Sequence, residues 1–160
     1  MNALPDAISF VLILATAFSG VLAGASLDQS IKQLPARHQI GVKAYSSYAQ
    51  ASDLKNGILW YAFIGLGAAL LTIVSAILVF SQGSSFSQAL PIYLAAVLSV
   101  LHTLATTRAA PTMFSQRRYS DDETALAGVF DRFERWQAIR AGLQVLAFGA
   151  LLWGLLIYRR

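Results

Sequence analysis

The sequence predicts an all-α fold: a four-helix integral membrane bundle, forming a single domain over residues 1–160. Apolar residues make up 56% of the chain and charged residues only 12%, about half the charge of a typical soluble domain. Four stretches reach the roughly 20 apolar residues that a helix needs to cross a bilayer. Alternating ten-residue segments, which would indicate a membrane barrel, are absent from the sequence.

The four predicted spans lie at about residues 7–27, 57–80, 90–107 and 139–158. The first two contain no charged residue. The third contains His102, and the fourth contains Arg140 near its start. Because hydrocarbon cannot hydrogen-bond a free backbone, each span is expected to be a continuous helix.

Basic residues are distributed unequally between the two sides of this topology. Loops 28–56 and 108–138 together hold nine Lys and Arg residues, against two at the C-terminus. The positive-inside rule then predicts cytoplasmic loops and both termini outside, with a bacterial inner membrane as the default location. The net charge of +4 suits anionic lipid headgroups. The basic residues lack an interleaved aromatic platform, so no nucleic-acid partner is expected.

Both long loops are predicted to contain short interfacial helices. In the first, the helix of span one extends to Pro35, which ends it because proline lacks a backbone donor. Tyr45 and Tyr48, at helical spacing within 41–50, predict a second short helix.

In the second long loop, Ser120 is the expected N-cap of a helix that runs on into span four. Asp131 and Arg135 are expected to pair at i,i+4 on its polar face. Apolar residues on the opposite face recur at helical spacing: Leu126, Phe130 and Phe133.

Two polar stripes are predicted to face each other inside the bundle. Ionisable residues within spans are costly and often mark functional sites. His102 and Gln144 each lie about five residues, roughly 8 Å, inside the same membrane surface. The stripe on span three is Ser99, His102 and Thr106, and the stripe on span four is Gln137, Arg140 and Gln144.

One hypothesis places a pocket for a flat lipophilic molecule with a polar oxygen between these stripes. His102 would exchange a proton, and Arg140 would stabilise negative charge on oxygen. The candidate catalytic residues are His102, Arg140 and Gln144, and the candidate binding residues are Arg108, Ser99, Thr106, Gln137 and Asp28. The alternative is structural: His102 hydrogen-bonds to Gln144, and the arginines reach lipid phosphates.

Glycines in the first two spans favour close helix contact. Gly20 and Gly24 form a small-xxx-small pattern, which permits close packing or leaves a gap for a ligand. Gly65 and Gly67 are expected to serve helix packing.

The sequence predicts no cofactor and no metal. It contains no cysteine and only two histidines. This composition excludes iron–sulfur clusters and argues against bis-histidine haem within one chain. The spans contain no paired carboxylates, which a bound metal would favour.

Several short motifs are spread over the chain. They are Ser19-Gly20 with Gly24, Leu34-Pro35-Ala36-Arg37, Ala110-Pro111-Thr112, Phe133-x-x-Trp136-Gln137-x-x-Arg140 and Leu146-Ala147-Phe148. Together they resemble the anthrone-oxygenase-like family of small four-helix membrane proteins. The resemblance implies a four-helix bundle and, in some members, oxidation of an anthrone by dioxygen without metal or flavin. The family pattern has a histidine before the arginine of the last helix. Aligned on Arg140, Gln137 stands in its place, and His102 would have to substitute.

Three function classes remain open from the sequence, which favours the first over the other two because the chain is small and has no set of cofactor ligands. The first is a non-catalytic accessory or scaffold subunit, with other membrane-protein subunits or a homo-oligomer as partners. The second is a cofactor-independent oxygenase acting on a lipophilic aromatic. The third is a binder of a lipid-like or quinone-like molecule.

Overall fold

The computed structural model describes residues 3–158 of the chain, with side chains from residue 7 onward. Every regular element within these residues is a helix, which confirms the all-α prediction. The elements are α1 (Ala3–Asp28), the π-helical turn η1 (Gln29–Gln33), α2 (Leu34–Ile40), α3 (Val42–Ala51), the π-helical turn η2 (Ser52–Asn56), α4 (Gly57–Ser81), α5 (Phe86–Ser115), the 3-10 turn η3 (Gln116–Arg118) and α6 (Glu123–Tyr158).

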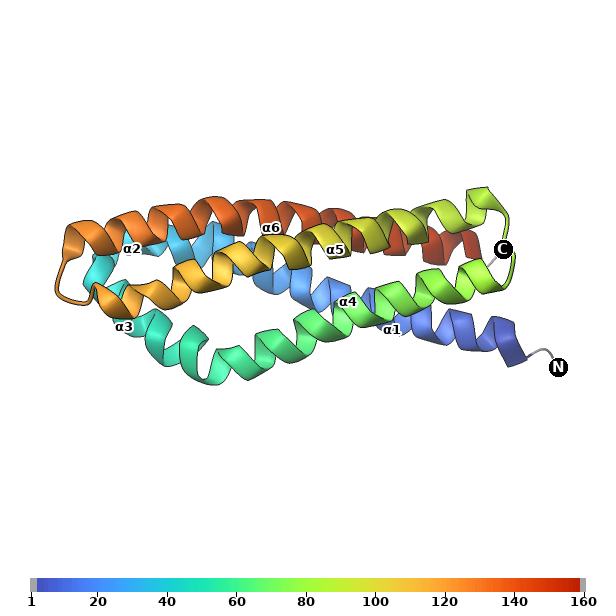
Figure 1. Ribbon diagram of the computed structural model, residues 1–160, viewed down its shortest axis with the longest axis horizontal. Coiled ribbons are helices and arrows are strands. Elements are labelled where there is room, and N and C mark those ends of the chain that lie inside the picture. Colours follow the sequence, from blue (N-terminus) through green and yellow to red (C-terminus); the bar gives the residue numbers. More distant parts are fainter. Residues whose placement is uncertain (1–2, 159–160) are drawn as a thin grey trace.

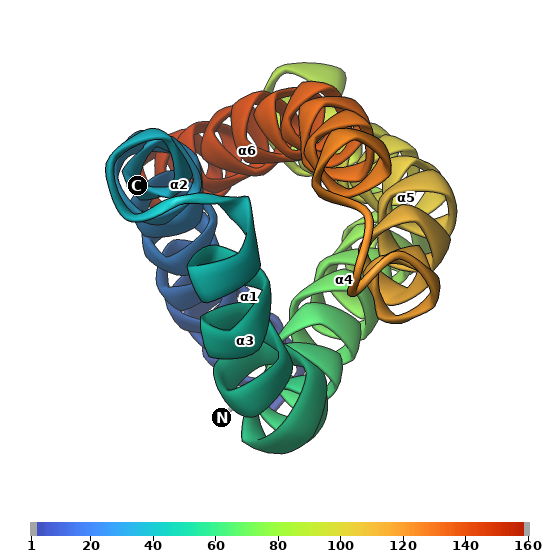
Figure 2. The same cartoon turned by 90° about the vertical axis from the view of Figure 1, so that its left-hand side faces the viewer.

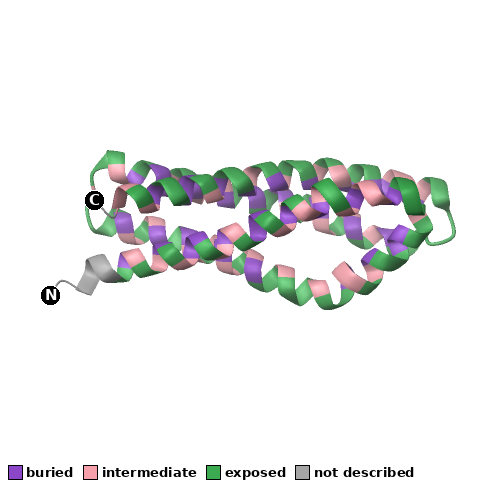
Figure 3. Cartoon of the chain, turned by 180° about the vertical axis from the view of Figure 1, so that it is seen from behind, coloured by how far each residue is buried: buried purple, intermediate pink, exposed green. Residues whose placement is uncertain are grey.

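These elements form four long helical rods that are apolar enough to cross a membrane. The rods cover residues 7–40, 42–81, 86–118 and 123–158. At a rise of about 1.5 Å per residue each exceeds the roughly 30 Å hydrocarbon core, so each extends beyond it. Within the most apolar 18-residue stretch of each rod, only 28–39% is buried inside the protein. Exposed residues cover the outer surfaces of the rods (Figure 3). This is consistent with a multi-pass membrane protein.

The rods pack in a ring, in the order α1, α4, α5 and α6, with α1 and α5 on a diagonal (Figure 2). The contact between α5 and α6 is the most extensive, and that between α4 and α5 is the least extensive of the four. We call the end with α2, α3 and the α5–α6 turn the basic end, and the opposite end, with the α4–α5 turn, the turn end. Towards the basic end α4 diverges from α5 (Figure 1).

Pro35 does not end the first rod, in contrast to the sequence-based prediction. The π-helical turn η1 precedes it, and the Leu34 N–H donates to the Gln29 carbonyl five residues back. Pro35 then stands in the first turn of α2, where a backbone donor is not needed. The rod ends at Gly41, whose φ of 86° favours glycine. The predicted short helix over 41–50 is confirmed as α3.

The second long loop is shorter than predicted, because α5 continues through Pro111 to Ser115. A single helix, α6, runs from this loop into span four, as expected, so the loop contains no separate short α-helix. The predicted Ser120 cap is wrong: Asp122 Oδ1 accepts the Ala125 N–H at 2.9 Å. The predicted pair of Asp131 with Arg135 is also wrong, because Asp131 binds Arg37 instead.

Arg37 joins α2 to α6 at the basic end. Its side chain is only 2% exposed, and its Nη2 lies 3.0 Å from Asp131 Oδ1 and 2.6 Å from Glu134 Oε2. Its Nη1 donates to the Leu34 carbonyl at 2.9 Å. The two carboxylates offset the burial of the guanidinium, and the planar fork makes these bonds directional. An apolar cluster surrounds this end: Leu34, Tyr45, Ala49, Leu54, Ala109, Met113, Leu126, Phe130 and Phe133.

Replacing Arg37 with alanine is expected to lower the free energy of unfolding in mild detergent by about 2 kcal/mol, because charge-assisted hydrogen bonds are lost and a buried gap is left. The free energy of unfolding of Arg37→Lys should lie between those of the natural protein and of Arg37→Ala, because an ammonium lacks the planar set of donors of a guanidinium. Arg132→Ala is the matched control, because Arg132 is exposed and bonds only within its own helix. Equal stability of Arg37→Ala and Arg132→Ala would contradict a stabilising role for the ion pairs of Arg37.

Candidate functional site

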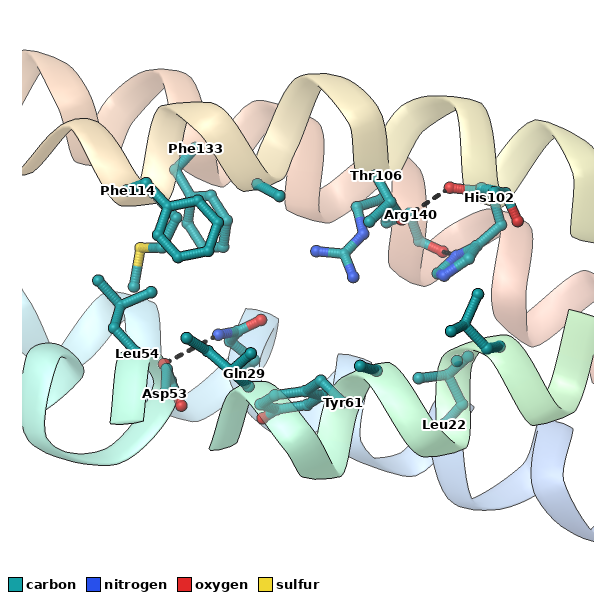
Figure 4. A pocket seen from close by; sticks show the side chains of 17 residues that line it. Leu22, Gln29, Asp53, Leu54, Tyr61, His102, Thr106, Phe114, Phe133 and Arg140 are labelled. Carbon is teal, nitrogen blue, oxygen red and sulfur yellow. Dashed lines mark hydrogen bonds between the residues drawn. The ribbon is translucent and has the colours of Figure 1, made fainter. Parts of the chain in front are cut away.

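A cavity of about 380 Å³ lies inside the ring, towards the basic end (Figure 4). Its lining comes from α1, α4, α5 and α6 and from both π-helical turns. On the side of the basic end, the cavity is bounded by Leu54, Met113 and Phe133. On the side of the turn end, it is bounded by Leu22. Most of the lining is apolar, which is typical of small-molecule sites.

The cavity exists because, between the two ends of the bundle, α4 packs against α1 but diverges from α5. At the turn end, residues such as Leu12, Ile92 and Leu151 are fully buried in one apolar cluster. Between the two end clusters α4 diverges, and small residues face inward, including Gly65 and Ala110. A Cβ on Gly65 would meet nothing within 4 Å.

The glycines therefore divide into two roles. Gly67 presses against Phe18, which would lie 2.5 Å from an added Cβ, and Gly20 presses against Phe148 at 2.9 Å. These two serve close packing, as predicted. Gly65 and Gly24 have open space beside them, so the packing prediction is wrong for Gly65, which widens the cavity.

His102 lies on α5 at the cavity wall and is only 6% exposed. Its Nδ1 lies 3.1 Å from the Arg140 carbonyl oxygen. Because a carbonyl only accepts, Nδ1 carries the proton, and Nε2 of the neutral ring is left as an acceptor. Nε2 has no hydrogen-bond partner among the described residues. The predicted bond from His102 to Gln144 is not formed.

Arg140 points into the cavity from α6 (Figure 4). Its Nη1 donates to Gln137 Oε1 at 2.9 Å, and Nε is buried without a partner. Among the described side chains, no carboxylate lies within 4.0 Å of the guanidinium. Gln137 is itself anchored, since its Nε2 donates to the Ser26 carbonyl at 3.1 Å. The guanidinium is therefore positioned but not neutralised by the protein.

The cavity has one acidic side chain, Asp53, on the side of the π-helical turns. Gln29 Nε2 donates to Asp53 Oδ2 at 3.2 Å, so η1 and η2 meet here. Asp53 precedes the apolar span that begins at Gly57. Burial raises the pKa of its carboxyl above the ordinary value, although hydrogen bonds from Gln29 and Ser52 oppose the shift. Tyr61, also half-buried, adds a hydroxyl to the same wall.

The structure brings three of the predicted site residues to the cavity: His102, Arg140 and Thr106. Thr106 Oγ1 donates to the His102 carbonyl at 2.9 Å. Gln137 contacts Arg140 but does not line the cavity. Ser99 is buried outside the lining.

The remaining predicted residues lie elsewhere. Gln144 faces α1 and donates to Ser19 Oγ at 2.8 Å. Arg108 is exposed on α5. Asp28 pairs with Lys32 at 2.5 Å and accepts from Gln33. The sequence did not predict Gln29, Asp53 or Tyr61 at the site. Gln29 and Asp53 lie in π-helical turns, which have no periodicity that would bring them together, and Tyr61 lies near the start of an apolar span, a position that is typical of an interface anchor.

The cavity opens sideways between α4 and α5. Ile58 and Leu66 on α4 line it and are 38% and 60% exposed, and Phe114 on α5 is 42% exposed. The other exposed lining residues, Ala62 and Thr103, also lie on these two helices.

Within the described residues, no group of three His, Cys, Asp or Glu side chains could hold a metal ion. The site therefore provides a proton acceptor, His102 Nε2, and a charged hydrogen-bond donor, the Arg140 guanidinium, whose charge no described carboxylate neutralises.

Comparisons of the chain with protein-family models, with curated proteins and with solved structures yield no match.

Because the natural sequence has no cysteine, a single introduced cysteine can report on the cavity. Ala110→Cys is expected to react with a small methanethiosulfonate reagent about tenfold faster or more than Ala109→Cys. Ala110 lines the cavity, whereas its neighbour Ala109 is fully buried in the cluster at the basic end. The measurement is the rate of labelling by mass spectrometry. Equal rates at the two positions would contradict an accessible cavity.

Proposed function

We propose that this chain is a multi-pass membrane protein that binds a lipophilic small molecule with a polar oxygen in the cavity. The observation that carries the proposal is the guanidinium of Arg140, which projects into a mostly apolar cavity with no carboxylate partner among the described residues. An unpaired charge removed from water is costly unless something compensates it. A bound oxygen would supply the missing acceptor, and the apolar walls would cover the rest of the molecule.

The orientation in the membrane is part of this proposal. The basic end carries the nine Lys and Arg residues of the two long loops. The positive-inside rule favours this end in the cytoplasm and both termini outside. The cavity then lies near the cytoplasmic leaflet, at the level where headgroups meet acyl chains.

A catalytic role on the same molecule is a second candidate, favoured by the joint position of His102 and Arg140. His102 Nε2 can accept a proton from a hydroxyl, and Arg140 can stabilise the oxyanion that forms. This is the chemistry that a cofactor-independent, anthrone-oxygenase-like enzyme would need before dioxygen reacts. Its test is oxygen uptake with a phenolic or anthrone substrate, lost in both His102→Ala and Arg140→Gln.

The accessory-subunit hypothesis is supported by a different observation, on the outer face of α6. Gly142 and Gly149 are exposed there, seven residues apart, with nothing against them. Small residues on one helix face permit close approach of a partner helix. Purification in mild detergent tests it: partner subunits present in stoichiometric amounts after a salt wash would favour this role over an independent binder.

Arg140→Gln is expected to lose the bound lipophile. The protein purified from its native membrane should carry one dominant small molecule in about equimolar amount, identified by mass spectrometry. Removing the charge should lower its occupancy about tenfold or more, because charge-assisted hydrogen bonds are among the strongest single contacts. Arg135→Gln is the matched control, since Arg135 is exposed on the same helix and does not line the cavity. The same molecule at the same occupancy in Arg140→Gln would contradict the proposal.

A further inference from the structure

We propose that the ligand is a single-chain amphiphile with a carboxylate head, of the fatty-acid class, which enters the cavity from the bilayer between α4 and α5. This inference rests on the proposed function and specifies its ligand. Four features of the cavity support it: its charge, the free edge of Arg140, the depth of Arg140 and the composition of the mouth.

One cation of the described lining is available to pair with one anionic group. Arg140 is the only Lys or Arg among the described lining residues. Nearby cations are engaged elsewhere: Arg37 binds Asp131 and Glu134, and Lys32 binds Asp28. Asp53 also lines the cavity without pairing with Arg140, and it disfavours a doubly charged head more strongly than a singly charged one. A phosphate monoester carries about −1.5 to −2, so a carboxylate is the better match.

The hydrogen-bonding geometry of Arg140 leaves one edge of the guanidinium free. Nη1 is occupied by Gln137 Oε1, Nε is buried without a partner, and Nη2 has no partner among the described residues. The Nε–Nη2 edge presents two parallel N–H groups, which match the two oxygens of a carboxylate. Because Nε is covered by protein atoms, bidentate binding requires a small rotation of the side chain.

The depth of Arg140 matches that of a carboxylate in a leaflet. Its backbone lies at the depth of His102, because the Arg140 carbonyl is 3.1 Å from His102 Nδ1. Its side chain points back towards Phe133 and the basic end (Figure 4), which brings the guanidinium closer to the boundary of the hydrocarbon core. A fatty acid in the bilayer holds its head at this same boundary. It can therefore move sideways into the cavity without lifting its chain into water.

The mouth between α4 and α5 has the composition that an acyl chain needs. Ile58, Leu66 and Phe114 line the cavity and are also exposed at the surface. The cavity of about 380 Å³ lies near the lower end of the usual range for small-molecule sites, about 300–1,000 Å³. The head and the first part of the chain fill it, and the rest of the chain leaves through the mouth between these side chains.

The test is photo-crosslinking of the full chain in phosphatidylcholine nanodiscs with a diazirine-bearing palmitic acid. Labelling is expected on the peptides of α4 and α5 that flank the mouth. Oleate in excess should remove this labelling, whereas oleyl alcohol and lysophosphatidic acid should not. The probe that stays in the surrounding bilayer should label the outer face of α6, and this labelling serves as the internal reference for labelling at the mouth.

Two variants with matched controls connect the labelling to the cavity. Arg140→Gln and Gly65→Phe are expected to lower labelling at the mouth about tenfold, the first by removing the charge and the second by filling open space beside Gly65. The controls are Arg135→Gln and Gly149→Phe, the latter on the exposed face of α6. Unchanged labelling at the mouth in both Arg140→Gln and Gly65→Phe would overturn the inference.

Other outcomes separate this inference from the proposed function. Competition by oleyl alcohol as strong as that by oleate would overturn the carboxylate head, and so would stronger competition by lysophosphatidic acid. If Arg140→Gln loses its co-purified lipophile while no carboxylate competes for the mouth, the cavity binds a different lipophile. The fatty-acid inference then fails and the proposed function stands.

Discussion

The arrangement of the bundle depends on two glutamines of α6 that donate to α1. Gln144 Nε2 binds Ser19, and Gln137 Nε2 binds the Ser26 carbonyl, seven residues away on each helix. In an apolar surrounding, packing and hydrogen bonds hold helices together, since lipid is as apolar as the side chains. These bonds therefore determine the register of α6 on α1. Gln137 Oε1 also accepts a hydrogen bond from Arg140, so the same register determines the direction in which the Arg140 guanidinium projects into the cavity.

The cavity follows from unequal packing along the bundle. Apolar clusters close the turn end and the basic end, and Arg37 adds ion pairs between α2 and α6 at the basic end. Between them α4 contacts α1 closely, where Gly67 meets Phe18, but diverges from α5. The two π-helical turns meet beside this divergence, where Gln29 of η1 donates to Asp53 of η2. Such turns are often found at functional sites.

Hydropathy was sufficient to predict the helices but not their ends. The four apolar stretches and the run of α6 from loop to span were predicted, because long periodic segments depend on local pattern. The end of the first rod at Pro35 and the Ser120 cap were wrong. Both depend on choices among competing local hydrogen bonds: a π-helical turn accommodated Pro35, and Asp122 capped α6 instead.

The sequence by itself determined that the chain forms apolar helices, where its charge collects, and that His102 and Arg140 are unusual, because each property is carried by the residues themselves. Only the tertiary structure decided that Gln144 faces α1, that Arg108 faces outward, and that Asp53 joins His102 and Arg140 at one cavity. Small differences in helix rotation and register decide such neighbours. These depend on contacts between residues more than one hundred positions apart, such as Gln144 with Ser19, which no local pattern specifies.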